Sequence, residues 1–116
     1  MMKRYRWAEV EKQQLTPAAA RQMIHGDAIT LARFELKKGA SIPEHSHPNE
    51  QITTLESGRM RFQLGGEELI LEPGESLHIP AHLPHSAEAL ENSVAFDVFS
   101  PPREDWIRGS DAYLRK

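Results

Sequence analysis

The sequence predicts an all-β protein, and three observations support this fold class. Short segments alternate between apolar and polar residues with a period of two, which is the side-chain period of a strand. Glycines and prolines separate these segments at fairly even spacing. No internal repeat or low-complexity segment interrupts them. Short, evenly spaced strands are typical of a β-sandwich or a β-barrel.

Six segments in the body of the chain are expected to form strands. They cover residues 28–36, 51–55, 59–64, 67–71, 76–79 and 94–99. Along the first of them, Phe34 and Leu36 share a face, whereas Arg33 and Glu35 fall on the other. The pair Gly65-Gly66 predicts a hairpin turn between the third and fourth segments.

The two ends of the chain are less regular. Thr16 and Pro17 could begin a helix as N-cap and first helical residue, or could lead into a strand at residues 22–25. Residues 101–108 are expected to end in a short helical turn. We expect a single domain over residues 1–116, with an N-terminal arm and strands at 1–27, a barrel core at 28–100 and a tail at 101–116.

Composition excludes several classes of function. The chain has 116 residues, 39% hydrophobic and 27% charged, as in an ordinary soluble domain that is small enough to favour dimerisation. The net charge is −3 and no basic stripe is present, so nucleic acid is not an expected partner. No run of 18 apolar residues and no hydrophobic leader occur, which predicts no membrane partner and a cytoplasmic location. The absence of cysteine excludes disulfides and thiolate ligands.

Two short histidine blocks indicate a metal site held by nitrogen and oxygen ligands. His45 and His47 lie two residues apart, so on an extended strand both imidazoles would face one ion. The second block contains His85, which follows Pro84 and a preceding Ile-Pro pair and is placed at the end of a strand. A fourth ligand could come from Gln51, which has the same parity as His45 and His47, or from Glu50.

The glycines and prolines around these blocks resemble the two motifs of the cupin superfamily. The first motif is matched by Gly39, His45, His47, Gln51 and Gly58, and the second by Pro73, Gly74, Glu75, Ile79, Pro80 and His85. The resemblance implies an RmlC-like jelly roll, the cupin double-stranded β-helix. It also favours the strand over the helix after Thr16, and Gln51 over Glu50 as the fourth ligand.

The expected ligands would make a neutral shell of three imidazoles and one amide. A divalent ion in such a shell keeps its full charge and polarises bound oxygens, which favours Lewis-acid chemistry. Zinc, nickel, manganese and ferrous ion all suit these ligands. The other histidines are not expected to be ligands. His25 is predicted at the surface, and His78 could face either the lumen or solvent. His82 lies in the loop before His85, where lining the pocket mouth is the less favoured of its possible places.

The strand at residues 94–99 carries an acid among apolar neighbours. Ala95, Asp97 and Phe99 share one face, and a buried carboxylate needs a partner. Asp97 could pair with Arg103 for structural reasons, or it could act beside the metal as a general acid or base. The residues alone leave both interpretations open.

The segment from Asp97 through Phe99 to Arg103 resembles the Asp-x-Phe-x-x-x-Arg segment of the KdgF-type cupins of pectin and alginate degradation. The similarity runs from about Arg21 to Trp106. It implies a metalloenzyme that opens unsaturated monouronates from polysaccharide lyases to linear keto acids. In that interpretation Asp97 transfers a proton, Arg103 holds the substrate carboxylate with a two-pronged hydrogen bond, and Phe99 packs against the sugar.

Two other functions fit the same fold. One is a ferrous-iron dioxygenase, which would consume oxygen, and the other is a non-catalytic cupin that binds a small molecule. A homodimer is expected in each case, because cupins often cover an exposed edge strand with an arm from a second subunit. Residues 5–10, which are apolar at intervals, are the candidate arm.

Overall fold

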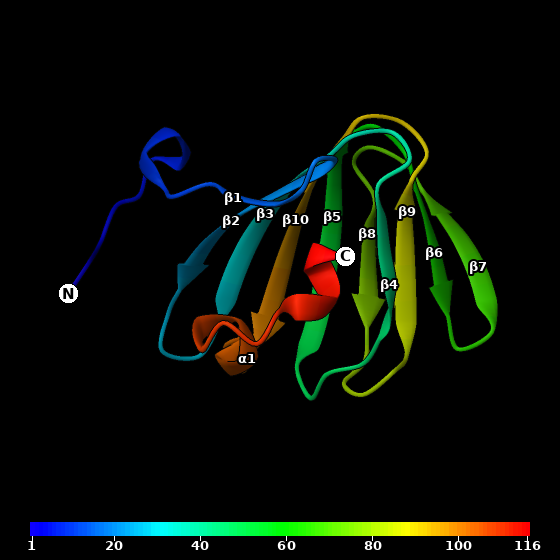
Figure 1. Cartoon of the computed structure of the whole chain (residues 1–116). Helices are drawn as coiled ribbons and strands as arrows, with labels where there is room; N and C mark the ends of the chain where they lie inside the picture. Colours follow the sequence, from blue (N-terminus) through cyan, green and yellow to red (C-terminus); the bar gives the residue numbers. More distant parts are fainter.

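A computed structural model of residues 1–116 shows two antiparallel β-sheets packed face to face (Figure 1). The six-stranded sheet consists, in spatial order, of β1 (Gln13–Thr16), β2 (Ala19–His25), β3 (Thr30–Leu36), β10 (Ser93–Ser100), β5 (Glu50–Ser57) and β8 (Ser76–Ile79). The four-stranded sheet consists of β4 (Ser41–His45), β9 (His85–Ala89), β6 (Met60–Leu64) and β7 (Glu67–Leu71). The chain is therefore all-β, a jelly roll, as the sequence predicted.

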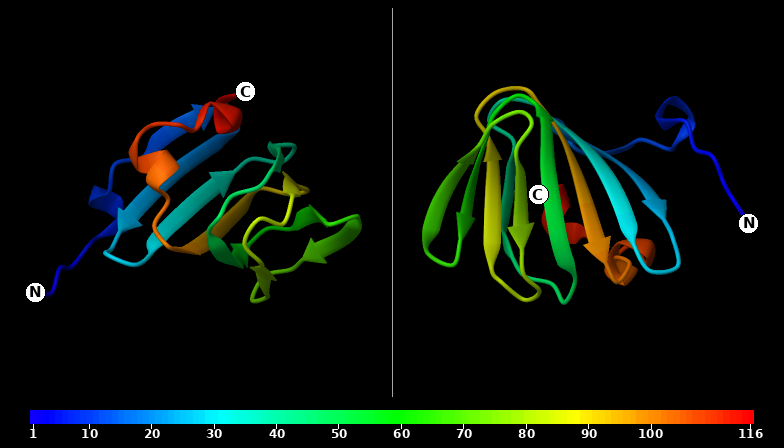
Figure 2. Two further views of the ribbon diagram at one scale, coloured as in Figure 1. Left: turned by 90° about the horizontal axis from the view of Figure 1, so that it is seen from below. Right: turned by 180° about the vertical axis from the view of Figure 1, so that it is seen from behind.

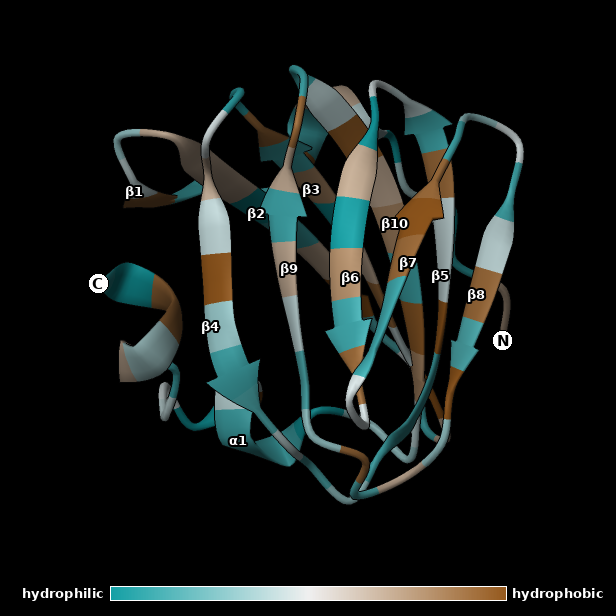
Figure 3. Ribbon diagram, turned by 90° about the vertical axis from the view of Figure 1, so that its right-hand side faces the viewer, coloured by the Kyte–Doolittle hydropathy of each residue, from teal (hydrophilic) through white to brown (hydrophobic).

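The alternation seen in the sequence decides which residues face the space between the sheets. In β3, the residues with even numbers are buried from Thr30 to Leu36, while the odd-numbered residues are partly exposed. Strand β10 alternates in the same way from Ser93 to Phe99. The brown and teal residues that alternate along the strands in Figure 3 show this division. The core between the sheets includes Phe34, Leu36, Leu55, Met60, Phe62, Leu71 and Ala95.

The helix that could begin at Thr16 is absent, and the alternative strand interpretation is correct. Strand β1 ends at Thr16 and pairs with β2, which runs from Ala19 to His25. The hydroxyl of Thr16 accepts a hydrogen bond from the amide of Ala18 at 3.2 Å, which stabilises a turn instead of a helix start. Strands β1, β4 and β9 were not among the expected six, because they are short and carry little apolar alternation.

Gly58 allows a close approach between two parts of the chain. It has φ +90°, and a Cβ at this position would overlap the Ser93 hydroxyl and the Asn92 carbonyl oxygen. Any side chain would therefore collide with the start of β10. This explains why glycine stands at the end of the first motif.

The two termini behave differently. The N-terminal residues before the 3-10 turn η1 (Trp7–Glu9) extend away from the body of the molecule (Figures 1 and 2). The C-terminal segment contains α1 (Glu104–Ile107), the expected helical turn, and η2 (Ala112–Arg115), which contacts both β1 and β4. Strands β1 and β4 end the two sheets on one side, so the C-terminal segment closes that side. None of these helical turns is long enough to cross a membrane.

Candidate metal centre

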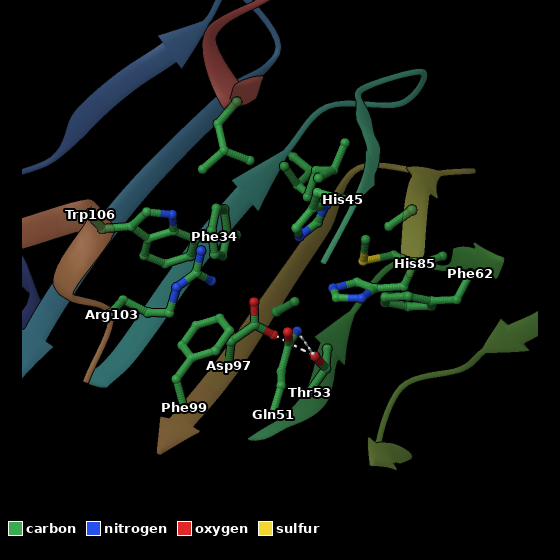
Figure 4. A pocket seen from close by; sticks show the side chains of 16 residues that line it. Phe34, His45, Gln51, Thr53, Phe62, His85, Asp97, Phe99, Arg103 and Trp106 are labelled. Carbon is green, nitrogen blue, oxygen red and sulfur yellow. Dashed lines mark hydrogen bonds between the residues drawn. The ribbon is translucent and has the colours of Figure 1, made fainter. Parts of the chain in front are cut away.

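Three histidines converge between the two sheets. One ring nitrogen from each of His45, His47 and His85 lies within 4.8 Å of the others, close enough for all three to hold one ion. His47 and His85 are buried, and His45 is partly buried. Figure 4 shows His45 and His85 directed into the same pocket. The grouping predicted from the two histidine blocks is therefore present.

The backbone brings these histidines together differently from the prediction. His45 is the last residue of β4, and His47 lies beyond that strand, so the two do not share one strand face. His85 begins β9 instead of ending a strand, and it pairs directly with His45 across the sheet. Pro48 has no backbone N–H and cannot continue a ladder, so the chain turns here before β5 begins.

Hydrogen bonds to the backbone determine which ring nitrogen of each histidine is free. In all three histidines Nδ1 lies at hydrogen-bond distance from a carbonyl oxygen two residues away in the sequence. The acceptors are Pro43 for His45 at 2.9 Å, Asn49 for His47 at 3.0 Å and Leu83 for His85 at 2.7 Å. A carbonyl can only accept, so Nδ1 carries the proton and Nε2 keeps its lone pair. Backbone carbonyls orient metal-binding histidines in the same way.

Burial keeps these rings neutral. It lowers the pKa of His45 and His47 to about 4 and also lowers the pKa of His85. Near pH 7 a cation can therefore bind without displacing protons. The Nε2 atom of His85 is buried and has no hydrogen-bond partner in the chain. A metal ion would satisfy this lone pair, so the residues present fit a metal site.

Gln51 lies beside the histidines, whereas Glu50 does not. The Oε1 atom of Gln51 is 3.1 Å from Nε2 of His47, and its amide nitrogen donates to the hydroxyl of Thr53 at 2.8 Å. Glu50 is exposed, and its carboxylate contacts the ring of His78 at 2.7 Å on the outside of the barrel. At the start of β5, Gln51 therefore faces inward and Glu50 faces outward.

Asp97 lies on the inward face of β10, as the strand pattern predicted. It is only 9% exposed, and its Oδ1 accepts a hydrogen bond from the Thr53 hydroxyl at 2.6 Å. Burial raises its pKa to about 6, although the Thr53 hydrogen bond and the charge of Arg103 oppose the rise. Asp97 forms no salt bridge with Arg103, so the structural pairing considered for these two residues is absent.

Arg103 is fully buried and has a different partner. Its Nε and Nη2 atoms donate to the two carboxylate oxygens of Asp105 at 3.0 and 2.8 Å. The guanidinium carbon lies 3.8 Å from the ring centre of Trp106 and 4.7 Å from that of Phe99. Its Nη1 atom is buried without a hydrogen-bond partner. Arg103 is thus held rigidly with one nitrogen free.

These side chains line one cavity of about 40 Å³, which has room for about three water molecules. Its polar lining comes from His45, His85, Gln51, Thr53, Asp97 and Arg103. Apolar residues complete the wall, among them Phe62 from the four-stranded sheet, Phe99 from the six-stranded sheet and Leu114 from the C-terminal segment. Figure 4 shows Asp97 and Gln51 lying between Arg103 and the histidines.

The other three histidines lie outside the cavity. His25 is exposed at the end of β2, with its Nδ1 atom 2.8 Å from the Thr30 hydroxyl. His78 points outward to Glu50. His82 is exposed with φ +67° and does not line the cavity, contrary to the suggested place at its mouth. His82 contacts the site only through its backbone N–H, which donates a 2.8 Å hydrogen bond to the carbonyl oxygen of His47.

Sequence reasoning missed three residues of the site. Thr53 could have been found, because it lies two residues after Gln51 and therefore on the same strand face. Asp105 could also have been considered as the partner of the nearby Arg103. Tyr113, whose hydroxyl contacts Arg103 at 2.9 Å, gives no signal in the sequence, because tertiary packing alone brings the tail back to the barrel.

The fold and the site together define a class of small β-barrel proteins that carry an inward-facing histidine cluster. A profile of the cupin domain matches residues 32–99, more than half of the chain, and the chain belongs to the cupin family. No curated protein sequence matches the chain significantly.

Among solved structures, the chain is similar to KdgF from Halomonas sp., with 29% identity and a TM-score of 0.85. That match covers 91% of this chain and 99% of the Halomonas chain. An RmlC-like cupin from Shewanella frigidimarina matches with 26% identity and a TM-score of 0.80, over 85% of this chain and 90% of the other. Oxalate decarboxylase from Bacillus subtilis, studied for its Mn(II) centres, shares 19% identity with a TM-score of 0.75. That match covers 84% of this chain and 29% of the decarboxylase, and it concerns the fold alone.

Proposed function

We propose that this protein is a metal-dependent enzyme that opens unsaturated monouronates, the products of polysaccharide lyases, to linear keto acids. The observation that carries the proposal is that one cavity gathers a histidine cluster, a buried acid and a buried arginine. The similarity to Halomonas KdgF over nearly the full length of both chains supports it. The Asp-x-Phe-x-x-x-Arg segment, by which the chain resembles KdgF-type cupins, faces this cavity.

The proposed metal ligands are His45, His47, His85 and Gln51, around one divalent ion. Three neutral imidazoles and one amide oxygen suit zinc, nickel, manganese or ferrous ion. When bound, the ion supplies Lewis-acid polarisation of a substrate oxygen. The amide of Gln51 is oriented for this role, because Thr53 accepts from its nitrogen and leaves Oε1 directed at His47.

Asp97 is the proposed proton carrier. Its Oδ1 atom accepts a hydrogen bond from the hydroxyl of Thr53, and its Oδ2 atom is the other carboxylate oxygen. We assign to Oδ2 the proton that leaves the anomeric hydroxyl as the ring C–O bond breaks. Protonation of the carbon at the far end of the double bond then converts the resulting enol to a ketone. The reaction is an isomerisation, so no atom is gained or lost.

Phe99 and Arg103 are the proposed substrate-binding residues. Phe99 is 1% exposed and lies edge-on to His47, with 5.6 Å between ring centres, so its ring can pack against the sugar beside the metal. Arg103 presents its unpaired Nη1 atom to the carboxylate. The expected two-pronged contact from Arg103 alone does not fit, because Asp105 and Tyr113 already occupy Nη2.

The C-terminal segment forms one wall of the cavity through Leu114. Residues 108–116 form no backbone hydrogen bond with the barrel. Side chains alone attach this segment, mainly through a buried 2.7 Å salt bridge between Arg21 and Asp111.

We also propose a homodimer that forms through the outer face of the six-stranded sheet. An apolar row crosses four neighbouring strands there, with Ile24 beside Leu31, Leu31 beside Val98 and Val98 beside Ile52. Ile52 is 47% exposed and Val98 is 39% exposed, which is unusual for adjacent apolar residues on a sheet. Trp7 from the N-terminal arm packs on Phe96 of the same face. The preceding residues extend beyond the body, where a second copy could contact them.

The test is an assay on lyase-digested pectin and alginate with protein purified without added metal. The unsaturated monouronate released by the lyases should lose its ultraviolet absorbance, and the reaction should consume no oxygen. Asp97→Asn, which keeps an oxygen that can accept from Thr53, should abolish this loss while metal content and fold stay unchanged. Oxygen uptake would favour a dioxygenase, and ligand binding without turnover would favour a non-catalytic cupin.

A further inference from the structure

Arg103, which lines the cavity, and its hydrogen-bond partner Tyr113 together leave two hydrogen-bond donors without acceptors. On Arg103, Asp105 occupies Nε and one side of Nη2, and Tyr113 occupies the other side of Nη2. Only Nη1 remains, and it is buried without a partner. An unpaired buried guanidinium nitrogen is costly, so this atom is suited to a ligand that supplies an oxygen.

The hydroxyl of Tyr113 is the second free donor. Its oxygen accepts from Arg103 Nη2 at 2.9 Å and from Trp106 Nε1 at 3.1 Å. A phenolic oxygen has two lone pairs and one hydrogen, so these two bonds use both lone pairs. The chain offers no acceptor for the remaining hydrogen of Tyr113. The free O–H and the free Nη1–H therefore belong to residues that are already hydrogen-bonded to each other.

Tyr113 is not itself one of the cavity-lining residues, but it contacts residues that are. Its ring stacks on the ring of His45 with 4.8 Å between centres, and the next residue, Leu114, lines the cavity. Tyr113 thus lies between two cavity-lining residues, His45 and Arg103. Asp105 already neutralises the charge of Arg103. The hydroxyl of Tyr113 adds a hydrogen-bond donor beside Arg103 without adding charge.

We propose that Tyr113 is a specificity-determining residue whose hydroxyl, together with Nη1 of Arg103, binds the substrate carboxylate. A carboxylate is a pure acceptor with two oxygens, and it satisfies both donors at once. The inference rests on the proposed function for the nature of the substrate. It assigns a binding role to the C-terminal segment, which lies outside the matched cupin domain at residues 32–99.

The experiment compares two sugars that differ only at the carboxylate. D-galacturonate and D-galactose are titrated by calorimetry into the metal-loaded protein and into Tyr113→Phe. The unmodified protein should bind the uronate at least tenfold more tightly than galactose, and Tyr113→Phe should lose about tenfold for the uronate alone, the effect of one hydrogen bond to a charged group. Tyr5→Phe, in the exposed arm, is the matched control and should bind both sugars unchanged.

Two results would overturn the inference. One is an equal loss for both sugars in Tyr113→Phe, which would mean that the residue only shapes the site. The other is an unmodified protein that does not prefer the uronate. Melting temperature and metal content verify each variant, and Tyr113→Leu replaces Tyr113→Phe if the latter does not fold. Because the sugars are saturated and unreactive, failure of the ring-opening assay would leave this binding result intact.

Discussion

Thr53 and Asp97 lie opposite each other on β5 and β10, and the Thr53 hydroxyl donates a 2.6 Å hydrogen bond to Oδ1 of Asp97. Because that hydroxyl has given its hydrogen to Asp97, it can only accept from the Gln51 amide, at 2.8 Å. The Gln51 oxygen must then face His47. One hydroxyl therefore orients the proposed proton carrier and the proposed fourth metal ligand together.

Thr53→Val should weaken metal binding about 10- to 100-fold, the usual cost of removing a residue that orients a metal ligand. Valine keeps the shape of threonine but lets the Gln51 amide rotate. Calorimetric titration of the metal-free protein with zinc measures the effect. Thr54→Val is the matched control, because the Thr54 hydroxyl contacts Ser76 on the exterior. Equal affinities in the two variants would contradict the orienting role.

His85→Ala should lose bound metal after dialysis, while His78→Ala should retain it. Both residues lie near the two ends of the loop between β8 and β9, but only His85 directs a free Nε2 atom into the cluster. His78 instead contacts Glu50 on the exterior. Metal analysis by atomic emission, with melting temperature as a check on folding, gives the comparison. Full metal retention in His85→Ala would argue against a shared site.

Metal affinity should stay constant from pH 8 down to about pH 5 and then fall. Burial lowers the pKa of His45 and His47 from 6.5 to about 4, so protons compete with the metal only in that lower range. Competition with a chelating indicator of known pH dependence measures the affinity at each pH. A decline that already begins near pH 6.5 would mean that these imidazoles titrate as if they were in water.

Asp97→Asn should stabilise the metal-free protein at pH 8 by up to about 3 kcal/mol, because the pKa of Asp97 rises from 3.8 to about 6 on burial. Between those values the folded state binds more protons than the unfolded state, so the free energy of unfolding falls as the pH rises. The gain should vanish below pH 4, where Asp97 is protonated in both states. Urea unfolding of chelator-treated protein at both pH values measures it. Asp27→Asn, in an exposed turn, should change neither value.

Val98→Lys should convert the proposed dimer to a monomer of 13.2 kDa, because it places a charge in the centre of the apolar row. Leu69→Lys is the control, since Leu69 is similarly exposed on β7 of the other sheet. Sedimentation equilibrium distinguishes the two masses. A monomer in the unmodified protein, or a dimer that survives Val98→Lys, would exclude this interface.

Much of the fold could be predicted because local patterns determine it. The alternation of buried and exposed residues in β3 and β10, the turn at Gly65-Gly66 and the strand position of Asp97 all follow from the period of two. The three histidines were found because residue type and spacing together restrict a metal site. Their geometry was partly wrong, because β4 already ends at His45 and His47 lies beyond it.

The sequence by itself determined the all-β class, the cupin motifs and most of the polar residues that line the cavity, since these depend on residue type and short-range spacing. Only the tertiary structure decided how those residues are paired. The β5–β10 register aligns Thr53 with Asp97, and the returning C-terminal segment brings Tyr113 to Arg103. The first contact spans 44 positions of the sequence and the second spans 10. No local periodicity specifies which donor meets which acceptor across a packed barrel.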